Sequence, residues 1–371
     1  MSGRRVLITG GAGFIGSHLG DHLLAHGWQV RALDALIPQV HGPGAVRPAG
    51  LDREVELQVG DVRDGAAVRR ALRGVDAVVH LAAAEGVGQS MYEVDRFTAA
   101  NDLGTAVLLQ ALLERPVARL VVASSMSLYG EGLYRDAQGN PVAAERSRPQ
   151  LLARRWEPVG PGGAPLEPAP TPETQPPALA SIYALSKFVQ ERQCLIVGAA
   201  YGIPAVALRL FNVYGTRQAL SNPYTGVLAI FASRLLNDRP PLVNEDGLQR
   251  RDFVAVRDAA ESFRLALEVR EAAGQVFNVG SGRSCTVLAA ACRLAAVLGR
   301  DVAPEVTGRC RVGDVRHCFA DVSRAREVLG YVPRVGLDAG LLELAEWLEG
   351  QIAHDRAGEA SAELASRGLS I

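Results

Sequence analysis

Short runs of apolar, mostly β-branched residues alternate with helix-length segments over the first 125 residues. Because the runs are apolar on both faces, they are typical of parallel strands that helices cover on both sides. They predict strands at 6–9, 29–33, 55–59, 77–80 and 120–123, and helices at 14–26, 65–73 and 96–114. This β-α-β rhythm predicts an α/β fold around a doubly wound parallel sheet.

The same pattern resumes after residue 180 and then loosens toward the C-terminus. It predicts helices at 182–200, 227–236, 258–269, 286–298 and 337–350, and strands at 205–210 and 276–279. We therefore expect a Rossmann-type domain over residues 1–210 and a smaller substrate-binding lobe mainly over residues 211–353. Residues 354–371 show no evident packing partner, and we expect a flexible tail there.

A proline-rich segment interrupts the pattern at residues 131–180. Ten of the 20 prolines lie between Pro141 and Pro177, with glycines among them. This composition favours a long surface insertion over a sheet element. A linker between domains is the alternative, but regular structure resumes afterwards in the same style. We expect a flap on one domain.

Composition narrows the class of protein. The 371 residues include 39 basic and 40 acidic side chains, a net charge of −1, which argues against nucleic acid or an anionic membrane as partner. The five cysteines show no metal-ligand spacing, so we expect no metal site and a reducing compartment. With no signal-like N-terminus and no long apolar stretch, we expect a cytoplasmic protein without a membrane partner. The basic residues comprise 38 arginines and one lysine, Lys187.

A glycine-rich string, Gly10-Gly11-Ala12-Gly13-Phe14-Ile15-Gly16, follows the first strand and opens a helix. Glycines at these positions allow a tight turn, close approach of a pyrophosphate and packing of helix on strand, while the helix N-terminus offers free N–H groups. We expect cofactor contacts from Gly10, Gly13, Phe14, Ile15 and Gly16.

Residues at the ends of the next strands extend this candidate dinucleotide site. Asp34 ends the second strand, where a carboxylate accepts hydrogen bonds from the adenosine ribose and repels a 2′-phosphate. The neighbouring Ala35 offers no charge to neutralise such a phosphate, so the sequence favours NAD over NADP. We expect Asp61 and Val62 near the adenine, and Leu81, Ala82 and Ala83 beneath the cofactor.

Tyr183 and Lys187 stand four residues apart at the start of a predicted helix and so share one face. A phenol is a poor base at neutral pH, and we expect Lys187, together with a positively charged nicotinamide, to lower the pKa of Tyr183. A compact ammonium can also bond the nicotinamide ribose. An ordinary helix with one Tyr and one Lys is the alternative, but the only lysine of the chain occupies this position.

Ser124 and Ser125 follow the strand at 120–123, at the edge where ligands of doubly wound sheets bind. We expect the Ser125 hydroxyl to bond the reacting oxygen and relay its proton to Tyr183. The alternative is a serine-rich turn. Ser125, Tyr183 and Lys187 are the predicted catalytic residues.

Together, these motifs resemble the extended short-chain dehydrogenase/reductase family, in particular its nucleotide-sugar epimerases and dehydratases, over residues 4–352. The matching motifs are the loop 10–16, His80-Leu81-Ala82-Ala83, Asn101 with Gly104-Thr105, Ser125 before Tyr129-Gly130, Tyr183 with Lys187, Asn212-Val213-Tyr214-Gly215, Arg251-Asp252-Phe253, and Arg311 with Asp314.

The resemblance implies an NAD cofactor and a nucleotide-sugar substrate. It implies that Asn212, Arg251 and Arg311 hold the nucleotide pyrophosphate, a dianion that such polar groups suit, and that Asp314 holds the ribose. It further implies cofactor contacts from Asn101 and Ser124, and substrate contacts from Ser90, Ser125, Met126 and Tyr183. Relatives dimerise through the helices that correspond to 96–114 and 182–200, so a homodimer is expected.

The residues after the fifth strand bear on the reaction. Dehydratases of this family carry an acidic pair there, whereas Ser125-Met126-Ser127 has no carboxylate and is similar to 4-epimerases. Local strings at 36–42, 87–92 and 222–226 resemble bacterial dTDP-L-rhamnose 4-epimerases, which make dTDP-6-deoxy-L-talose. Some of those relatives carry paired cysteines in the insertion, where this chain has Gly160-Pro161-Gly162-Gly163. UDP-hexose 4-epimerisation, 4-keto-sugar reduction and a noncatalytic NAD-sensing role are the alternatives.

Overall fold

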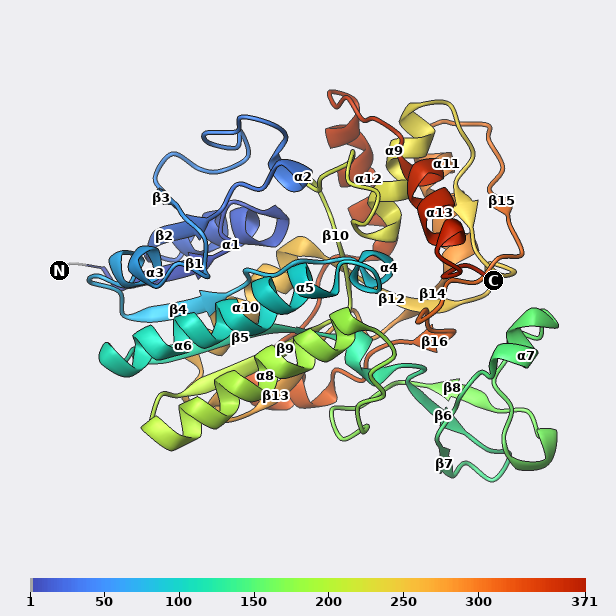
Figure 1. The fold of residues 1–371 in the computed structure, drawn as a ribbon, viewed down its shortest axis with the longest axis horizontal. Helices are drawn as coiled ribbons and strands as arrows, with labels where there is room; N and C mark the ends of the chain where they lie inside the picture. Colours follow the sequence, from blue (N-terminus) through green and yellow to red (C-terminus); the bar gives the residue numbers. More distant parts are fainter. Residues whose placement is uncertain (1–2) are drawn as a thin grey trace.

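Seven parallel strands form the central sheet of the computed structural model, which describes residues 3–371 (Figure 1). Their order is β13-β9-β5-β4-β1-β2-β3, so β1 lies between β2 and β4, and the chain crosses over at that point. Parallel sheets of this kind bind ligands where the strand order reverses, outside the carboxyl ends of the strands. The strands are β1 (Arg5–Thr9), β2 (Gln29–Asp34), β3 (Glu56–Val59), β4 (Ala77–His80), β5 (Arg119–Ser125), β9 (Ala205–Leu210) and β13 (Val276–Val279).

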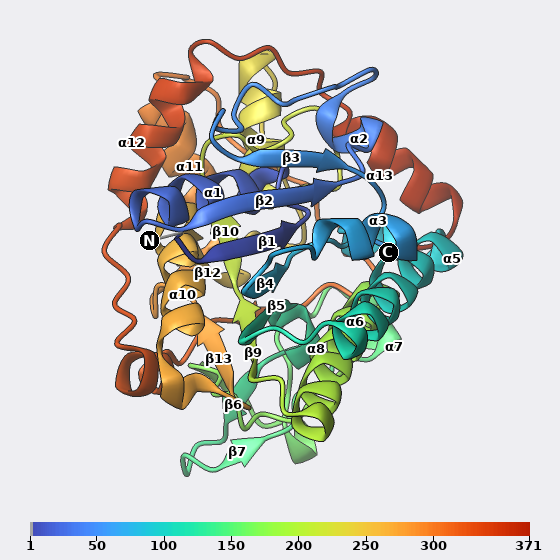
Figure 2. The same cartoon turned by 90° about the vertical axis from the view of Figure 1, so that its left-hand side faces the viewer.

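Helices cover both faces of this sheet (Figure 2). The residues of β1 alternate between two cores, with Val6 and Ile8 in one and Leu7 in the other. One face carries α1 (Phe14–Ala25) and α10 (Val256–Glu268); the other carries α3 (Gly65–Ala71), α6 (Gly104–Glu114) and α8 (Ile182–Tyr201). The predicted helix 96–114 is observed as α5 (Val94–Phe97), the π-helix η1 (Thr98–Leu103) and α6 in succession. The predicted doubly wound α/β fold is confirmed.

A smaller lobe from the C-terminal half packs around its own apolar core. It contains the helices α9 (Val227–Leu236), α11 (Val287–Val297) and α12 (Leu337–Leu348), and the strands β10 (Asn212–Tyr214), β11 (Leu242–Val243), β12 (Arg250–Ala255), β14 (Ser284–Thr286), β15 (Glu305–Val306) and β16 (His317–Cys318). However, β13 pairs with β9, and α10 packs on α1, so residues after 210 return to the first domain. The second lobe is expected mainly, not wholly, from residues 211–353, and this strand and helix are parts of that range that complete the sheet and one of its covering layers.

The insertion at 131–180 contains regular structure, which corrects its interpretation as a segment without sheet elements. Its strands β6 (Leu133–Arg135), β7 (Pro141–Val142) and β8 (Glu167–Ala169) form a small antiparallel sheet beside the short helix α7 (Arg148–Leu152). Each strand has only two or three residues, which is too short for a recognisable alternating pattern. This sheet lies apart from the central sheet, below the C-terminal lobe in Figure 1.

The last residues also differ from the expected unpacked tail. Residues Ala357–Ser366 form α13, in which Ala360 and Leu364 are buried. Beyond it, Ile371 exchanges two backbone hydrogen bonds with Cys310. Within residues 3–371, no helix combines the length and the apolarity needed to span a bilayer.

Candidate active site

A cavity of about 730 Å³ lies beside the carboxyl ends of β1, β4 and β5 and is also lined by residues of the C-terminal lobe. This size suits a small organic ligand or cofactor. Most predicted site residues line it: Gly10, Gly13, Phe14, Ile15, Gly16, Leu81, Ala83, Ser124, Ser125, Met126, Tyr183, Lys187, Asn212, Arg251, Arg311 and Asp314. Asp34, Asp61, Val62, Ala82, Ser90 and Asn101 lie outside this lining.

The glycine loop has no room for side chains. At Gly10, φ is +69° and a Cβ would lie 2.9 Å from the Ala82 nitrogen; at Gly16, a Cβ would lie 2.5 Å from the Gly10 oxygen. Helix α1 begins at Phe14 without a side-chain cap, so its first N–H groups are available to an anion. Close backbone approach and free donors are what a dinucleotide pyrophosphate requires, and the loop fits NAD.

Asp34 lies at the end of β2, next to this loop. Its carboxylate accepts hydrogen bonds from the backbone nitrogens of Ala12, at 3.0 Å, and Leu36, at 2.9 Å. His41 Nε2 lies 3.5 Å from Asp34 Oδ1, a neighbour that the sequence did not reveal. These contacts hold the carboxylate at the tip of the strand, and its binding of ribose stays a prediction.

Asp61 and Asn101, two other residues predicted to bind the cofactor, form contacts within the protein. Asp61 forms an ion pair with Arg63 at 2.6 Å. Asn101 is fully buried, where its amide bonds the backbone of Ala84 and donates to Ser186 Oγ at 2.8 Å. Asn101 therefore positions the chain after β4 and the first turns of α8, and it does not face the cavity.

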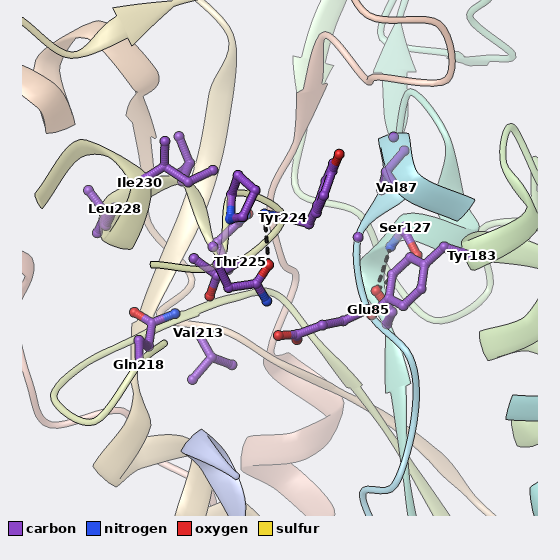
Figure 3. Close-up of a pocket in the computed structure, with 18 of the residues that line it drawn as sticks. Glu85, Val87, Ser127, Tyr183, Val213, Gln218, Tyr224, Thr225, Leu228 and Ile230 are labelled. Atoms are coloured by element: carbon purple, nitrogen blue, oxygen red, sulfur yellow. Dashed lines mark hydrogen bonds between the residues drawn. The ribbon is translucent and has the colours of Figure 1, made fainter. Parts of the chain in front are cut away.

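Ser125 and Tyr183 both line the cavity, and Figure 3 shows Tyr183 beside Ser127, two residues after Ser125. The Ser125 hydroxyl accepts hydrogen bonds from the backbone nitrogen of Ser127, at 3.1 Å, and from its hydroxyl, at 2.9 Å. Its acceptor positions are thus occupied, which leaves its own proton to be donated toward the phenol of Tyr183, whose pKa Ser125 lowers. The structure thus places both Ser125 and Tyr183 in the lining of one cavity.

The start of α8 is fixed by two serines. Ser181 caps the helix by accepting from the Ala184 nitrogen at 3.1 Å. Ser90, which is fully buried, accepts from the Tyr183 nitrogen at 3.0 Å. Ser90 was predicted to contact substrate; the structure instead makes it a support for the backbone of Tyr183.

In the protein alone, the pKa of Tyr183 is raised, and Lys187 is not among the causes. The expected lowering by Lys187 together with a positively charged nicotinamide stays a prediction. Burial is the main cause, the charge of Glu85 adds to it, and the hydrogen bond with Ser125 opposes it. Lys187 donates through Nζ to Gln190 Oε1 at 2.7 Å. Burial lowers the pKa of Lys187 to about 8. The protein alone therefore keeps the phenol protonated at neutral pH.

Glu85 is a cavity residue that the sequence reasoning missed. It lies on the loop between β4 and α4 (Val87–Ser90), and Figure 3 shows its side chain extending from the side of Tyr183 toward Gln218 and Thr225. Burial raises the pKa of its carboxyl, while Lys187 lowers it. Its position directly after the Leu81-Ala82-Ala83 string, which follows a parallel strand, is a signal that could have identified it.

Ser124 faces away from the chemistry. Its hydroxyl donates to Glu191 Oε2 at 2.6 Å, and Glu191 forms a buried ion pair with Arg209 at 2.7 Å. Arg209 also donates to the phenol of Tyr129 at 2.8 Å. Because the hydroxyl of Ser124 is bonded to Glu191, any contact of Ser124 with the cofactor must come from its other atoms that line the cavity.

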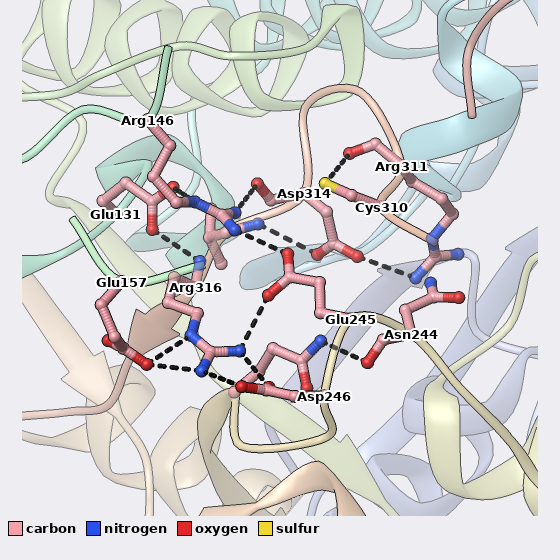
Figure 4. Close-up of polar contacts among 12 residues, drawn as sticks. Glu131, Arg146, Glu157, Asn244, Glu245, Asp246, Cys310, Arg311, Asp314 and Arg316 are labelled. Atoms are coloured by element: carbon pink, nitrogen blue, oxygen red, sulfur yellow. Dashed lines mark hydrogen bonds and ion pairs between the residues drawn. The ribbon is translucent and has the colours of Figure 1, made fainter. Parts of the chain in front are cut away.

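Two of the predicted nucleotide-binding residues, Arg311 and Asp314, lie next to each other in the cavity lining (Figure 4). Arg251 and Arg311 both pair with the carboxylate of Asp314, at 3.3 Å and 3.2 Å. Burial raises the pKa of Asp314, but Arg311, Arg251 and Arg146 outweigh this and hold it below its usual value. Two guanidinium groups beside one carboxylate form a site with net positive charge, which suits a pyrophosphate.

The same region is tied to the insertion by buried ion pairs (Figure 4). Arg316, which is fully buried, pairs with Glu245 at 2.9 Å, with Asp246 at 2.6 Å and with Glu157 of the insertion. Arg146, also of the insertion, pairs with Glu245 at 2.6 Å and donates to the Asp314 carbonyl at 2.9 Å. We call Glu131, Arg146, Glu157, Glu245, Asp246 and Arg316 the ion-pair cluster.

Comparison with known proteins places this site in a family. Residues 6–150 and 157–280 match the family model described as the NAD dependent epimerase/dehydratase family, and the chain belongs to that family. It is 37% identical over 354 residues to a dTDP-L-rhamnose 4-epimerase of Burkholderia thailandensis, an alignment that covers 94% of this chain and 96% of that protein.

Solved structures agree with this assignment. A UDP-glucose 4-epimerase of Thermotoga maritima with UDP-glucose has a TM-score of 0.76 at 30% identity and covers 93% of this chain and 98% of its own. A UDP-glucose 4-epimerase of Thermus thermophilus in complex with NAD has a TM-score of 0.75 at 32% identity and covers 94% and 100%. The predicted family, the isomerase class and NAD as cofactor are thereby confirmed.

Proposed function

We propose that this enzyme inverts the C4 configuration of dTDP-L-rhamnose, interconverting it with dTDP-6-deoxy-L-talose. The observation that carries the reaction type is the pairing of Ser125 with Tyr183 in a cavity whose glycine loop fits NAD. Met126 and Ser127, which follow Ser125, supply no carboxylate for dehydration. The similarity to the Burkholderia protein, over nearly the whole length of both chains, supports the substrate.

The residues of the chain have separate tasks in this reaction. Tyr183 removes the proton of the C4 hydroxyl, and Ser125 donates a hydrogen bond to the reacting oxygen. NAD⁺, when bound, supplies the acceptor for the C4 hydride and a positive charge that lowers the pKa of the phenol. Arg251 and Arg311 hold the pyrophosphate while the 4-keto sugar turns and presents its other face. The hydride then returns to C4, so the reaction is redox neutral.

Incubation with a panel of dTDP- and UDP-sugars, followed by NMR of the C4 configuration, tests this function. The proposal expects inversion of dTDP-L-rhamnose without added cofactor. UDP-hexose 4-epimerisation is the second candidate, favoured by the similarity to the Thermotoga protein, and would appear as inversion of UDP-glucose alone. Consumption of stoichiometric NADH with a 4-keto sugar would instead identify a reductase.

A homodimer remains part of the proposal. Leu103 at the end of η1 and Leu185 and Ile196 on α8 are exposed apolar residues, and α6 and α8 pack side by side (Figure 1). Exposed apolar side chains on adjacent helices favour association with a second copy. Light scattering of the purified protein distinguishes a dimer from a monomer.

A further inference from the structure

Glu85 is a carboxylate in the cavity without a partner. Within residues 3–371, no hydrogen bond or ion pair involves its side chain, which is exposed where it lines the cavity. The other acidic residues near the site differ from it: Glu191 pairs with Arg209, and Asp314 pairs with Arg251. Glu85 thus contributes nothing evident to the packing of the fold.

The position of Glu85 relates it to the reacting sugar. Glu85 lines the same cavity as Tyr183, the residue that a C4 hydroxyl must reach. In Figure 3 the side chain crosses the space between Tyr183 and the opposite wall. A hexose bound with C4 at Tyr183 therefore has Glu85 as a neighbour.

Two further oxygens in the cavity lining also lack partners. Asn212 Oδ1 and Gln218 Oε1 are both buried without a hydrogen bond in the described chain. These two oxygens have almost no accessible surface, whereas the exposed carboxylate of Glu85 is an unpaired acceptor that a ligand in the cavity can reach. A ligand with several hydroxyl groups, such as a hexose, offers hydrogen-bond donors to this carboxylate.

We propose that Glu85 determines sugar specificity by accepting hydrogen bonds from the hydroxyls of a neutral hexose and by disfavouring sugars that carry a carboxylate. The inference rests on the proposed function, because it takes this cavity as the sugar site. A hydrogen bond from a hydroxyl to a carboxylate is among the stronger neutral-to-charged contacts. Two carboxylates in one cavity repel each other, which weakens the binding of a sugar that carries a carboxylate.

Binding of matched sugar pairs to the NAD-loaded enzyme tests this role. The pairs are dTDP-glucose with dTDP-glucuronate and UDP-glucose with UDP-glucuronate, which differ only in an alcohol or a carboxylate at C6. Calorimetry on wild type, Glu85→Gln and Glu167→Gln gives each dissociation constant. Glu167 is exposed on β8 and its side chain forms no hydrogen bond or ion pair within residues 3–371, so it controls for the loss of one charge.

The wild type should bind the neutral member of a pair about thirtyfold tighter, and Glu85→Gln should reduce that preference to about threefold or less. Glu85→Gln should also raise the KM for the neutral substrate about tenfold, since it removes a binding contact. Glu167→Gln should retain the wild-type preference.

An unchanged preference in Glu85→Gln, or a wild type that binds uronates as tightly as hexoses, overturns the inference. Solvent deuterium entering C3 or C5 in the wild type, but not in Glu85→Gln, would also overturn it by making Glu85 a base. If only the UDP pair binds, the proposed dTDP substrate fails while the effect of Glu85 is still measured.

Discussion

Lys187 and Tyr183 share a helix face but have different surroundings. Tyr183 lines the cavity together with Ser125, whereas the ammonium of Lys187 donates to Gln190, whose amide in turn donates to Thr105 Oγ1 at 2.8 Å. Lys187 is only 4% exposed, so its ammonium is held in one place by packing and by this bond. The position therefore requires a compact cation on a slim stem.

Replacing Lys187 with Arg should leave the protein folded but lower kcat about a hundredfold, because the planar guanidinium cannot occupy the same point. Steady-state kinetics and circular dichroism measure both effects. Arg192→Lys, the reverse exchange at an exposed position of the same helix, is the control and should retain wild-type turnover. Near wild-type activity of Lys187→Arg would show that the solitary lysine is accidental.

The buried imidazole of His80 should make the free energy of unfolding of the protein depend on pH. Burial, with a smaller effect of the Lys187 charge, lowers its pKa from 6.5 to about 3. Between these values the unfolded chain binds one more proton than the folded chain, so stability is present above pH 6.5 and is lost as pH falls toward 3. The loss is at most about 1.4 kcal/mol per pH unit.

Urea unfolding of wild type and His80→Gln between pH 7.5 and 5 measures this effect. The wild type should lose more stability than the variant as pH falls below 6.5, because the amide that replaces the imidazole does not titrate. Identical slopes for the two proteins would mean that His80 is protonated in the folded state as readily as in the unfolded chain.

The conformation of the glycine loop between β1 and α1 should determine how tightly the protein binds NAD. A Cβ at Gly16 would meet the Gly10 oxygen at 2.5 Å, so Gly16→Ala must displace the loop from which α1 presents its N–H groups. NAD affinity should fall at least about tenfold. Gly350→Ala, where nothing lies within 4 Å of a new Cβ, is the matched control for cofactor binding measured by fluorescence. Equal affinities of the two variants would contradict the assigned role of the loop.

Chemistry confined to one element could be predicted from the sequence. The loop 10–16 and the pair Tyr183 and Lys187 each combine residue type with a spacing that one turn or one helix converts directly into geometry. The strands of the central sheet were likewise predictable. Each is buried on both faces and therefore appears in the sequence as a continuous apolar run. The seven-stranded sheet confirms that reasoning.

Features that depend on contacts distant in the sequence could not be predicted. The role of Ser90 arises from its bond to Tyr183, 93 residues later. Helix α13 packs because Leu364 reaches Gly88, and a short alanine-rich segment carries no sign of such a partner. The pKa of Tyr183 depends on Glu85, which a neighbouring strand brings close. Spacing along the chain holds no information on these distances.

In the molecule as a whole, the ion-pair cluster joins the insertion to the part of the cavity lined by Arg311 and Asp314. Arg316 and Glu245 are almost fully buried, and Arg146 joins them to the carbonyl of Asp314. Buried charges are costly unless all are paired, so the cluster holds the insertion in one position rather than simply adding stability.

Removing Arg316 should leave the buried Glu245 with one partner fewer and lower the free energy of unfolding. Arg316→Met should cost about 3 kcal/mol in urea unfolding, whereas Arg300→Met, which breaks an exposed pair with Asp238, should cost less than about 1 kcal/mol. Similar costs for the two variants would mean that the cluster is not a structural tie.

The central claim is that the enzyme inverts C4 by removing a hydride and returning it to the same carbon. NMR of dTDP-L-rhamnose carrying deuterium at C4 tests this most directly. The account predicts that dTDP-6-deoxy-L-talose forms with the deuterium still on C4 and without net NADH. Loss of that deuterium to solvent, or its absence from the inverted product, would contradict it.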